Sequence, residues 1–263
     1  MNKPIYEPRG RAREYGELAV NIYTGCNHGC FYCYAPAALR KSRNAFADVQ
    51  PRTDIVKAVW RQIDREEITG KTIFLCFTCD PYPADIDTKP TRAIIQAIKG
   101  NGNRVRILTK APSRTVRDWD LLDDGDEIGT TITGPTGWSR EHEPKADDTE
   151  RRLLTLESAH ASGLKTWVSL EPVFFPGLVY KVIRGCDFID FFKIGKLNHA
   201  ATPPEIIEAG GWAAFGGKAE RLCREYGRAY YIKEDLRAEM EREPHEATEG
   251  GERTVCGDII NGK

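Results

Sequence analysis

Short apolar runs recur along this chain about every 30 residues, with helix-like stretches between them. Seven runs are predicted to be strands: 18–24, 72–78, 104–109, 127–133, 165–170, 188–194 and 229–232. Strands that alternate with helices are typical of βα units and a parallel sheet. Because most of these runs are nearly continuous in apolar residues, we expect both faces of the sheet to be covered. The pattern predicts one open α/β barrel.

Three of the intervening segments have helical periodicity. Apolar residues at helical spacing predict a helix over 54–67, with Thr53 as its N-cap. A second helix is predicted over 91–99, ending at Gly100, and a third over 148–162. Each helix lies between two predicted strands, as the crossover connections of a parallel sheet do.

Polar or reactive residues lie at or just after the carboxyl ends of six predicted strands. In α/β folds the functional site lies at this edge of the sheet, because the loops that follow the strands meet there. The residues concerned are 24–26, 78–80, 109–110, 131–133, Ser169 with Glu171, and 193–196. We therefore expect the chemistry of this chain at the carboxyl ends of its strands.

Composition and charge exclude some classes of protein. Hydrophobic residues make up 40% of the chain and charged residues 29%, which argues against a disordered chain. No run approaches the roughly 18 apolar residues of a membrane helix, and residues 1–8 contain no apolar signal segment, so we expect a cytoplasmic protein. The net charge is −1, but residues 234–252 carry −6, which leaves +5 for the rest. This distribution allows a basic face without requiring one.

Three of the eight cysteines share one short loop: Cys26, Cys30 and Cys33. Thiols stay reduced in the cytosol, so this spacing indicates metal binding rather than disulfides. A zinc site needs a fourth ligand, a role open to His28. An iron–sulfur cluster is held by thiolates, and three of them leave one iron open to a substrate or cofactor. Gly25 and Gly29 favour the cluster, because they let the loop wrap with its N–H groups facing the sulfurs.

Two further cysteines, Cys76 and Cys79, lie near the end of the second predicted strand. Strand alternation places their side chains on opposite faces, which makes them a poor pair of metal ligands. It also places Cys79 on the same face as Phe77, at the carboxyl edge, before the Asp80–Pro81 step ends the strand. There Cys79 is either a hydrogen-atom donor or a small buried hydrophobe, and Cys76 is a core residue.

The cysteine loop, with Tyr32 before its last cysteine, resembles the signature of the radical S-adenosylmethionine (radical SAM) superfamily. An ordered set of further motifs is similar to the branch related to spore photoproduct lyase: residues 78–83 with 91–92, 107–110 with 117–122, and 143–144 with 151–153. The resemblance covers residues 18–197. It implies a partial (β/α)6 TIM-like barrel in a single domain over 1–263, with a C-terminal extension over 198–240 and an acidic tail over 241–263.

The same resemblance implies a radical SAM enzyme with a [4Fe–4S] cluster on Cys26, Cys30 and Cys33. S-adenosylmethionine would bind the fourth iron, and an electron donor such as flavodoxin or ferredoxin would drive its cleavage to a 5′-deoxyadenosyl radical. Cofactor contacts are expected from Tyr32 at the adenine, from Thr78, Cys79 and Asp80 at the methionine amino group, from Lys110 at the methionine carboxylate, and from Thr131 or Thr133. Substrate contacts are expected from Ser169, Glu171, Lys193 and Lys196.

Three functions stay open on the sequence. The first is radical chemistry on a nucleic acid base or nucleotide, in keeping with the lyase resemblance and the charge of +5 outside residues 234–252. The second is the same chemistry on a small metabolite or peptide, which suits the near-neutral total charge. The third is a non-catalytic zinc or iron–sulfur protein. The hydrogen-donating cysteine of the lyase falls on Phe77 in this sequence, with Cys79 two residues on, which is a departure from photoproduct repair.

Overall fold

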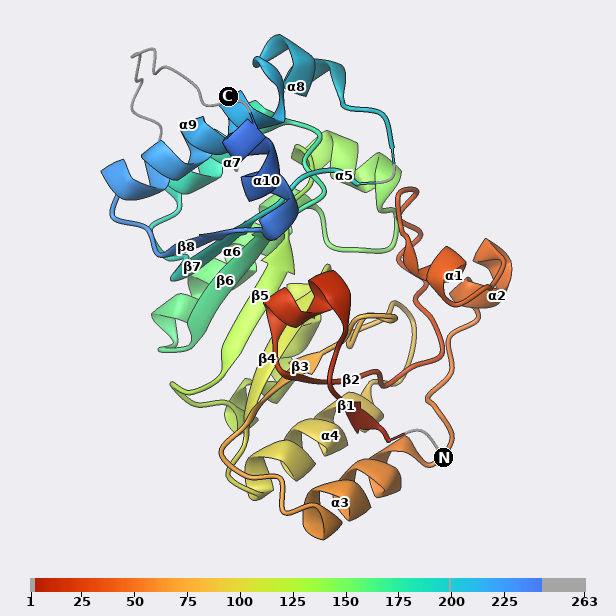
Figure 1. Cartoon of the computed structure of the whole chain (residues 1–263). Helices are drawn as coiled ribbons and strands as arrows, with labels where there is room; N and C mark the ends of the chain where they lie inside the picture. The colour runs from red at the N-terminus through yellow and green to blue at the C-terminus, as the bar shows by residue number, and fades with distance from the viewer. Residues whose placement is uncertain (1–2, 199, 243–263) are drawn as a thin grey trace. The chain divides into compact units, whose positions relative to one another are not determined.

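The computed structural model describes residues 3–198 and 200–242, which fall into two compact units (Figure 1). The first unit contains the chain up to residue 129 together with residues 140–147 and 163–165. The second contains residues 130–139, 148–162 and the chain from 166 onward. Most of the acidic tail expected over 241–263, and Cys256 with it, lies outside the described residues.

The first unit is built on strands that follow one another in chain order: β1 (Ile5–Tyr6), β2 (Leu18–Val20), β3 (Thr72–Leu75) and β4 (Arg104–Thr109). β1 is antiparallel to β2, whereas β2, β3 and β4 are parallel, with Leu75 opposite Val20 on one side and Ile107 on the other. These apolar residues are fully buried, as expected for parallel strands covered on both faces. The next strand, β5 (Glu127–Thr131), starts in the first unit and ends in the second.

The helices of the first unit are α1 (Ala35–Ala38), α2 (Arg43–Ala47), α3 (Ile55–Arg65) and α4 (Lys89–Gly100), with 3-10 helices η1 (Gly10–Tyr15) and η2 (Pro112–Leu121). α3 and α4 lie side by side (Figure 1). Val59 and Ile63 of α3 and Ile94 and Ile98 of α4 are buried in the same core as the strands. Burying each such side chain contributes about 1.5–3 kcal/mol. This core supports the loops that follow β2, β3 and β4.

The second unit contains the parallel strands β6 (Lys165–Leu170), β7 (Phe191–Ile194) and β8 (Tyr230–Ile232). Its helices are α6 (Thr149–Ala161), α7 (Pro176–Gly185), α8 (Pro204–Glu208), α9 (Gly211–Glu225) and α10 (Glu234–Arg242), and α5 (Thr136–His142) begins in it. α9 packs against α7, α8 and α10 (Figure 1). Because β6, β7 and β8 are parallel, the residues that follow them lie at one edge of this unit.

The structure matches two predicted strands, over 104–109 and 165–170, and shortens the others. The N-cap expected at Thr53 is wrong, because α3 is preceded by Asp54 in a left-handed conformation and no side chain caps the helix. The helix end expected at Gly100 is confirmed: that glycine is the last residue of α4, and the chain turns away at Gly102, whose φ is 69°. β1 was not predicted, because a strand of two residues is too short to show the alternation of apolar and polar residues. Among the described residues, no helix is both long enough and apolar enough to cross a membrane.

Candidate active site

The cysteine loop leaves β2 and reaches α1 without regular secondary structure, over residues 21–34. Its Cys26 N–H donates to the carbonyl of Phe46, 3.0 Å away, and a Cβ on Gly25 would lie 2.0 Å from the same oxygen. Glycine is therefore required at position 25 so that the loop can approach the end of α2. At position 29 the glycine has a φ of 77°, a turn that other residues rarely adopt. The His28 N–H faces the sulfur of Cys26 at 3.5 Å, as the sequence predicted for the backbone of this loop.

None of the three loop cysteines is in a disulfide, and Cys30 is buried while the other two are partly exposed. Burial raises the pKa of Cys26, and so do the neighbouring groups Asp80, Cys30 and Cys33. Burial also raises the pKa of Cys33, against the opposing effect of the charges of Lys110 and Arg43. In the described part of the chain, no three His, Cys, Asp or Glu side chains form a preassembled metal centre. The donor set nevertheless fits an iron–sulfur cluster, since it offers three uncrosslinked thiols on one loop with cations beside them.

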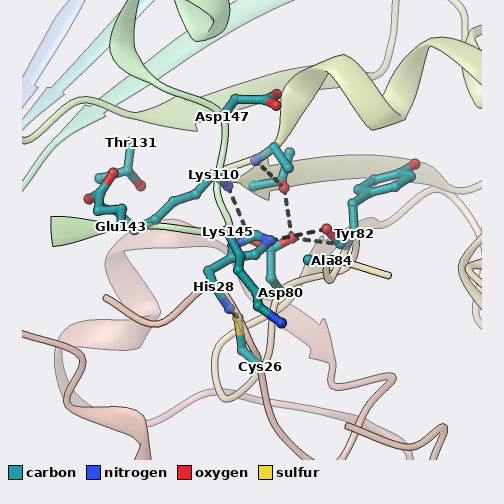
Figure 2. Close-up of polar contacts among 12 residues, drawn as sticks. Cys26, His28, Asp80, Tyr82, Ala84, Lys110, Thr131, Glu143, Lys145 and Asp147 are labelled. Atoms are coloured by element: carbon teal, nitrogen blue, oxygen red, sulfur yellow. Dashed lines mark hydrogen bonds and ion pairs between the residues drawn. The ribbon is translucent and has the colours of Figure 1, made fainter. Parts of the chain in front are cut away.

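His28 lies in the middle of this loop, and both of its ring nitrogens lie close to other protein groups. Its Nδ1 is 3.4 Å from Oδ2 of Asp80, and its Nε2 is 3.2 Å from the carbonyl oxygen of Tyr82 (Figure 2). Arg114 approaches the same Nε2 at 3.3 Å. Nε2 is therefore engaged by the Tyr82 carbonyl and Nδ1 lies next to the Asp80 carboxylate, which argues against His28 as the fourth ligand of a zinc site.

Asp80 joins the loop after β3 to the end of β4. Its Oδ1 accepts hydrogen bonds from the Tyr82 N–H at 2.8 Å and from the Thr109 hydroxyl at 2.6 Å (Figure 2). Its Oδ2 accepts the Lys110 N–H at 3.0 Å. The carboxylate is buried, and its hydrogen bonds hold the backbone at the start of the Lys110 loop. The contact predicted between Asp80 and the methionine amino group stays a prediction.

Tyr32 and Lys110 both contact the carboxylate of Glu143. They are the two predicted cofactor contacts of this unit with the longest side chains. The Lys110 ammonium lies 3.3 Å from Oε1 of Glu143 and 5.1 Å from the centre of the Tyr32 ring. The Tyr32 hydroxyl donates a hydrogen bond to the same carboxylate. Figure 2 shows Glu143 beside the Lys110 side chain. No role was predicted for Glu143, which the sequence marked only as part of the motif at residues 143–144.

Cys76 and Cys79 differ from the prediction. β3 ends at Leu75, and the N–H groups of Phe77 and Thr78 donate to the side-chain oxygen of Asn21 at 2.8 and 2.9 Å, so this stretch is a loop. The expected opposite faces for Cys76 and Cys79 are therefore wrong, because both thiols are buried outside the strand and each shifts the pKa of the other: burial and Cys79 raise the pKa of Cys76, and against the opposing effect of burial Cys76 lowers the pKa of Cys79. Cys79 Sγ also accepts the Tyr23 N–H at 3.4 Å. These contacts favour a packing role for Cys79, whose catalytic role stays a prediction.

In the second unit, the predicted substrate contacts lie at or just beyond the carboxyl ends of β6 and β7. Ser169 and Lys193 are buried, and the Lys193 ammonium lies 4.7 Å from the centre of the Tyr231 ring. Glu171 forms an ion pair with Lys233, with Oε2 2.6 Å from Nζ. Lys196 pairs with Glu239 of α10. Thr131, the last residue of β5, and Thr133, two residues beyond it, are buried.

Sequence reasoning missed three polar residues of this region: Lys233, Asn198 and Asp235. The amide nitrogen of Asn198 lies 3.4 Å from Oε1 of Glu171 and 2.6 Å from Oδ2 of Asp235. The available signal was the position of Lys233, which directly follows β8 as Glu171 follows β6. The sequence does not single out Lys233, because the motifs shared with the family become weak after residue 197.

Comparison with known proteins decides the family. The family model of the radical SAM superfamily matches residues 20–185. The chain belongs to the radical SAM superfamily. An uncharacterized protein of Methanocaldococcus jannaschii is 27% identical over 212 residues, which are 76% of this chain and 76% of that protein. An uncharacterized protein of Mycobacterium bovis is 28% identical over 171 residues, 59% of this chain and 48% of that protein.

Solved structures confirm the fold. Spore photoproduct lyase in complex with a dinucleoside spore photoproduct matches with a TM-score of 0.61 at 16% identity, covering 86% of this chain and 79% of the lyase. SuiB of Streptococcus suis bound to S-adenosylmethionine matches with a TM-score of 0.56 at 15% identity, covering 81% of this chain and 49% of SuiB. The predicted partial barrel of the radical SAM type is thus confirmed.

The family also confirms the general class of chemistry. The chain is a radical SAM enzyme, and its cofactors are S-adenosylmethionine and, by family, an iron–sulfur cluster. The family implies an external reductant. The non-catalytic metal protein that the sequence left open is not supported.

Proposed function

We propose that this radical SAM enzyme holds a [4Fe–4S] cluster on Cys26, Cys30 and Cys33 and acts on a nucleobase or nucleotide. When bound, the cluster supplies the electron that cleaves S-adenosylmethionine to methionine and a 5′-deoxyadenosyl radical, which removes a hydrogen atom from the substrate. The observation that carries this proposal is the position of three thiols, none of them in a disulfide, on one loop beside a lysine and a tyrosine joined by a buried carboxylate.

The chain's own residues bind and orient the cofactor. Lys110 offers a cation to the methionine carboxylate, and a charged hydrogen bond in a partly enclosed site is stronger than a neutral one. Tyr32 offers a ring face to the adenine. Asp80 fixes the backbone at Lys110 through the N–H bond of 3.0 Å. Thr78, Thr131 and Thr133 are further proposed cofactor contacts, and the contact proposed for Cys79 does not involve its buried thiol.

On the substrate side, Ser169, Glu171, Lys193 and Lys196 are the proposed contacts. The dinucleoside photoproduct bound to the similar lyase supports a nucleobase or nucleotide. Glu171 has Lys233 beside it, and Lys196 has Glu239 beside it, so acids offset the lysines at this edge of the second unit. That balance favours a nucleoside-sized substrate over a long polyanion, whose phosphates need several unpaired cations. A small metabolite or peptide is the second candidate, because the same balance of acids and lysines also suits a small substrate with little charge.

The electron donor is proposed to be a small redox protein of the flavodoxin or ferredoxin type. Dithionite replaces it in the test, so the identity of the donor does not affect the result. The anaerobically reconstituted protein is mixed with dithionite and S-adenosylmethionine, and 5′-deoxyadenosine is quantified with and without nucleosides, oligonucleotides and small metabolites. We expect the yield to rise with a nucleoside or nucleotide. Formation that never responds to any nucleobase, but rises with a metabolite or peptide, would replace the first substrate class by the second.

A further inference from the structure

The segment Arg140–Asp147 belongs to the first unit, although the residues on both sides of it belong to the second. It runs along the cysteine loop, where the Lys145 N–H donates to the His28 carbonyl at 3.1 Å and the His142 carbonyl accepts the Phe31 N–H at 3.3 Å. At its end, the Asp147 N–H donates to the Lys110 carbonyl at 2.9 Å. The segment is thus bonded to the cysteine loop and to the loop after β4.

Glu143 is the residue of this segment whose side chain faces Tyr32 and Lys110. Its side chain is 0% exposed, and a carboxylate without water is costly unless it is paired and hydrogen-bonded. Here the partners are the Tyr32 hydroxyl and the Lys110 ammonium. One buried carboxylate therefore ties together two side chains from different elements.

We infer that Glu143 is a positioning residue for S-adenosylmethionine, acting through Tyr32 and Lys110. The inference rests on the proposed function, in which those two residues contact the cofactor. Glu143 holds the Tyr32 ring in one orientation through its hydroxyl and holds the lysine ammonium 5.1 Å from the centre of that ring. An ammonium has three donors, so Lys110 can keep its bond to Glu143 while donating to the carboxylate of a ligand.

The stability of the folded protein does not by itself explain why Glu143 and Lys110 form a partly buried ion pair. A buried ion pair is often replaceable by apolar side chains without loss of stability, because desolvation offsets the attraction between the charges. The Lys110 side chain retains 17% exposure while Glu143 has none, so the lysine of the pair stays accessible to a ligand. Preorganisation of the two contacts reduces the conformational freedom lost on binding and so raises affinity.

The test compares Glu143→Gln with Glu141→Gln, a charge-neutralising change at an exposed glutamate of the same segment. Equilibrium binding of S-adenosylmethionine is measured on reconstituted protein without reductant, together with iron and sulfide content. We expect Glu143→Gln to keep the iron content and to weaken binding roughly tenfold or more, as loss of a charged hydrogen bond does. Glu141→Gln is expected to match the wild type.

A double-mutant cycle separates positioning from general damage. In a Tyr32→Phe/Lys110→Met background, Glu143→Gln should change binding little further, because the groups through which it acts are gone. Equal losses in both backgrounds, or unchanged binding in Glu143→Gln with normal iron content, would overturn the inference. Wild-type protein that assembles iron but binds no S-adenosylmethionine would overturn the proposed function, and the inference with it.

If Glu143→Gln fails to accumulate as folded protein, Tyr32→Phe carries the test. This change removes the hydroxyl bonded to Glu143 and leaves the ion pair with Lys110 in place. We expect several-fold weaker binding with unchanged iron content. Binding equal to that of the wild type would show that the Tyr32–Glu143 bond positions nothing, and the inference would fail.

Discussion

Each of the two units contains a partly buried lysine–glutamate ion pair. In one pair the lysine is the more exposed partner, and in the other the glutamate is. In the first unit, Lys110 and Glu143 lie 3.3 Å apart, with side chains 17% and 0% exposed. In the second unit, Lys233 and Glu171 lie 2.6 Å apart, with side chains 4% and 16% exposed. The first pair presents its cation and the second presents its carboxylate. The same two residue types thus suit an anionic group of a ligand in one unit and a hydrogen-bond donor or cation in the other.

The surroundings of each pair explain the difference. Glu143 is covered because its segment is bonded to the cysteine loop and to the loop after β4. Lys233 is covered at the end of β8, next to Gly195, where a Cβ would lie 2.8 Å from Cδ of Glu171 and 3.0 Å from Cδ of the lysine. Burial of one partner thus decides which charge a ligand can reach. We propose that the first pair serves the cofactor and the second the substrate.

The largest expected effect comes from removing the metal ligands. Replacing Cys26, Cys30 and Cys33 together with Ala should abolish iron binding and 5′-deoxyadenosine formation, because no thiolates remain to hold a cluster. Iron and sulfide analysis after anaerobic reconstitution measures the first effect, and chromatography of the nucleoside measures the second. The matched control replaces Cys186 and Cys223, both buried outside the loop, and should keep both properties. Stoichiometric zinc that iron cannot displace from the wild-type loop would contradict the radical chemistry.

Removing the exposed cation of the first pair ranks next. Lys110→Met should weaken S-adenosylmethionine binding roughly tenfold to a hundredfold, the equivalent of about 1.5–3 kcal/mol for a charged hydrogen bond, while cluster assembly is spared. Equilibrium binding to unreduced protein checks this. Lys89→Met, at a lysine that is 84% exposed, is the control. Unchanged affinity in Lys110→Met would mean that the first pair serves no ligand.

A smaller effect, on stability, is expected from adding a methyl group next to the Glu171–Lys233 pair. Gly195→Ala should lower the free energy of unfolding by about 1–3 kcal/mol, because the added methyl group overlaps both partners of the ion pair. Denaturant unfolding of the variant and the wild type gives this difference. S-adenosylmethionine affinity should not change, and a loss of affinity would show that the division of roles between the pairs is wrong.

The smallest effect is expected at Cys79. Because its thiol packs against Cys76 and the Tyr23 N–H, Cys79→Ala should cost about 1 kcal/mol of stability and keep normal cofactor cleavage and product. Product analysis by mass spectrometry checks this, with Cys76→Ala as the matched variant. Side products formed by Cys79→Ala but not by Cys76→Ala would support the hydrogen-donor role predicted from the sequence.

Regular elements were predictable where apolar runs had clear limits, as over 104–109 and 165–170. The second strand was predicted too long, because residues 76–78 have strand-like composition, but the N–H groups of Phe77 and Thr78 donate to the side chain of Asn21 instead of to a neighbouring strand. Thr53 and Asp54 are both good capping residues, and composition could not show that Asp54 adopts a left-handed conformation.

Site residues were predictable where a motif marked them and not where tertiary contacts define them. The cysteine loop and Lys110 follow from the sequence, because spacing and strand ends indicate them. The pairing of Lys110 with Glu143, and of Glu171 with Lys233, joins residues 33 and 62 positions apart. No local pattern encodes such distant partners, so the structure was needed to find them.

The affinity for S-adenosylmethionine of Lys110→Met and Glu171→Gln, measured side by side on reconstituted, unreduced protein, tests whether the two pairs divide cofactor and substrate between them. If the first pair serves the cofactor and the second the substrate, Lys110→Met should bind roughly tenfold to a hundredfold more weakly than the wild type. Glu171→Gln should bind as tightly as the wild type. An equal loss in both variants, or a loss in Glu171→Gln alone, would show that the two pairs do not divide the cofactor and the substrate in this way.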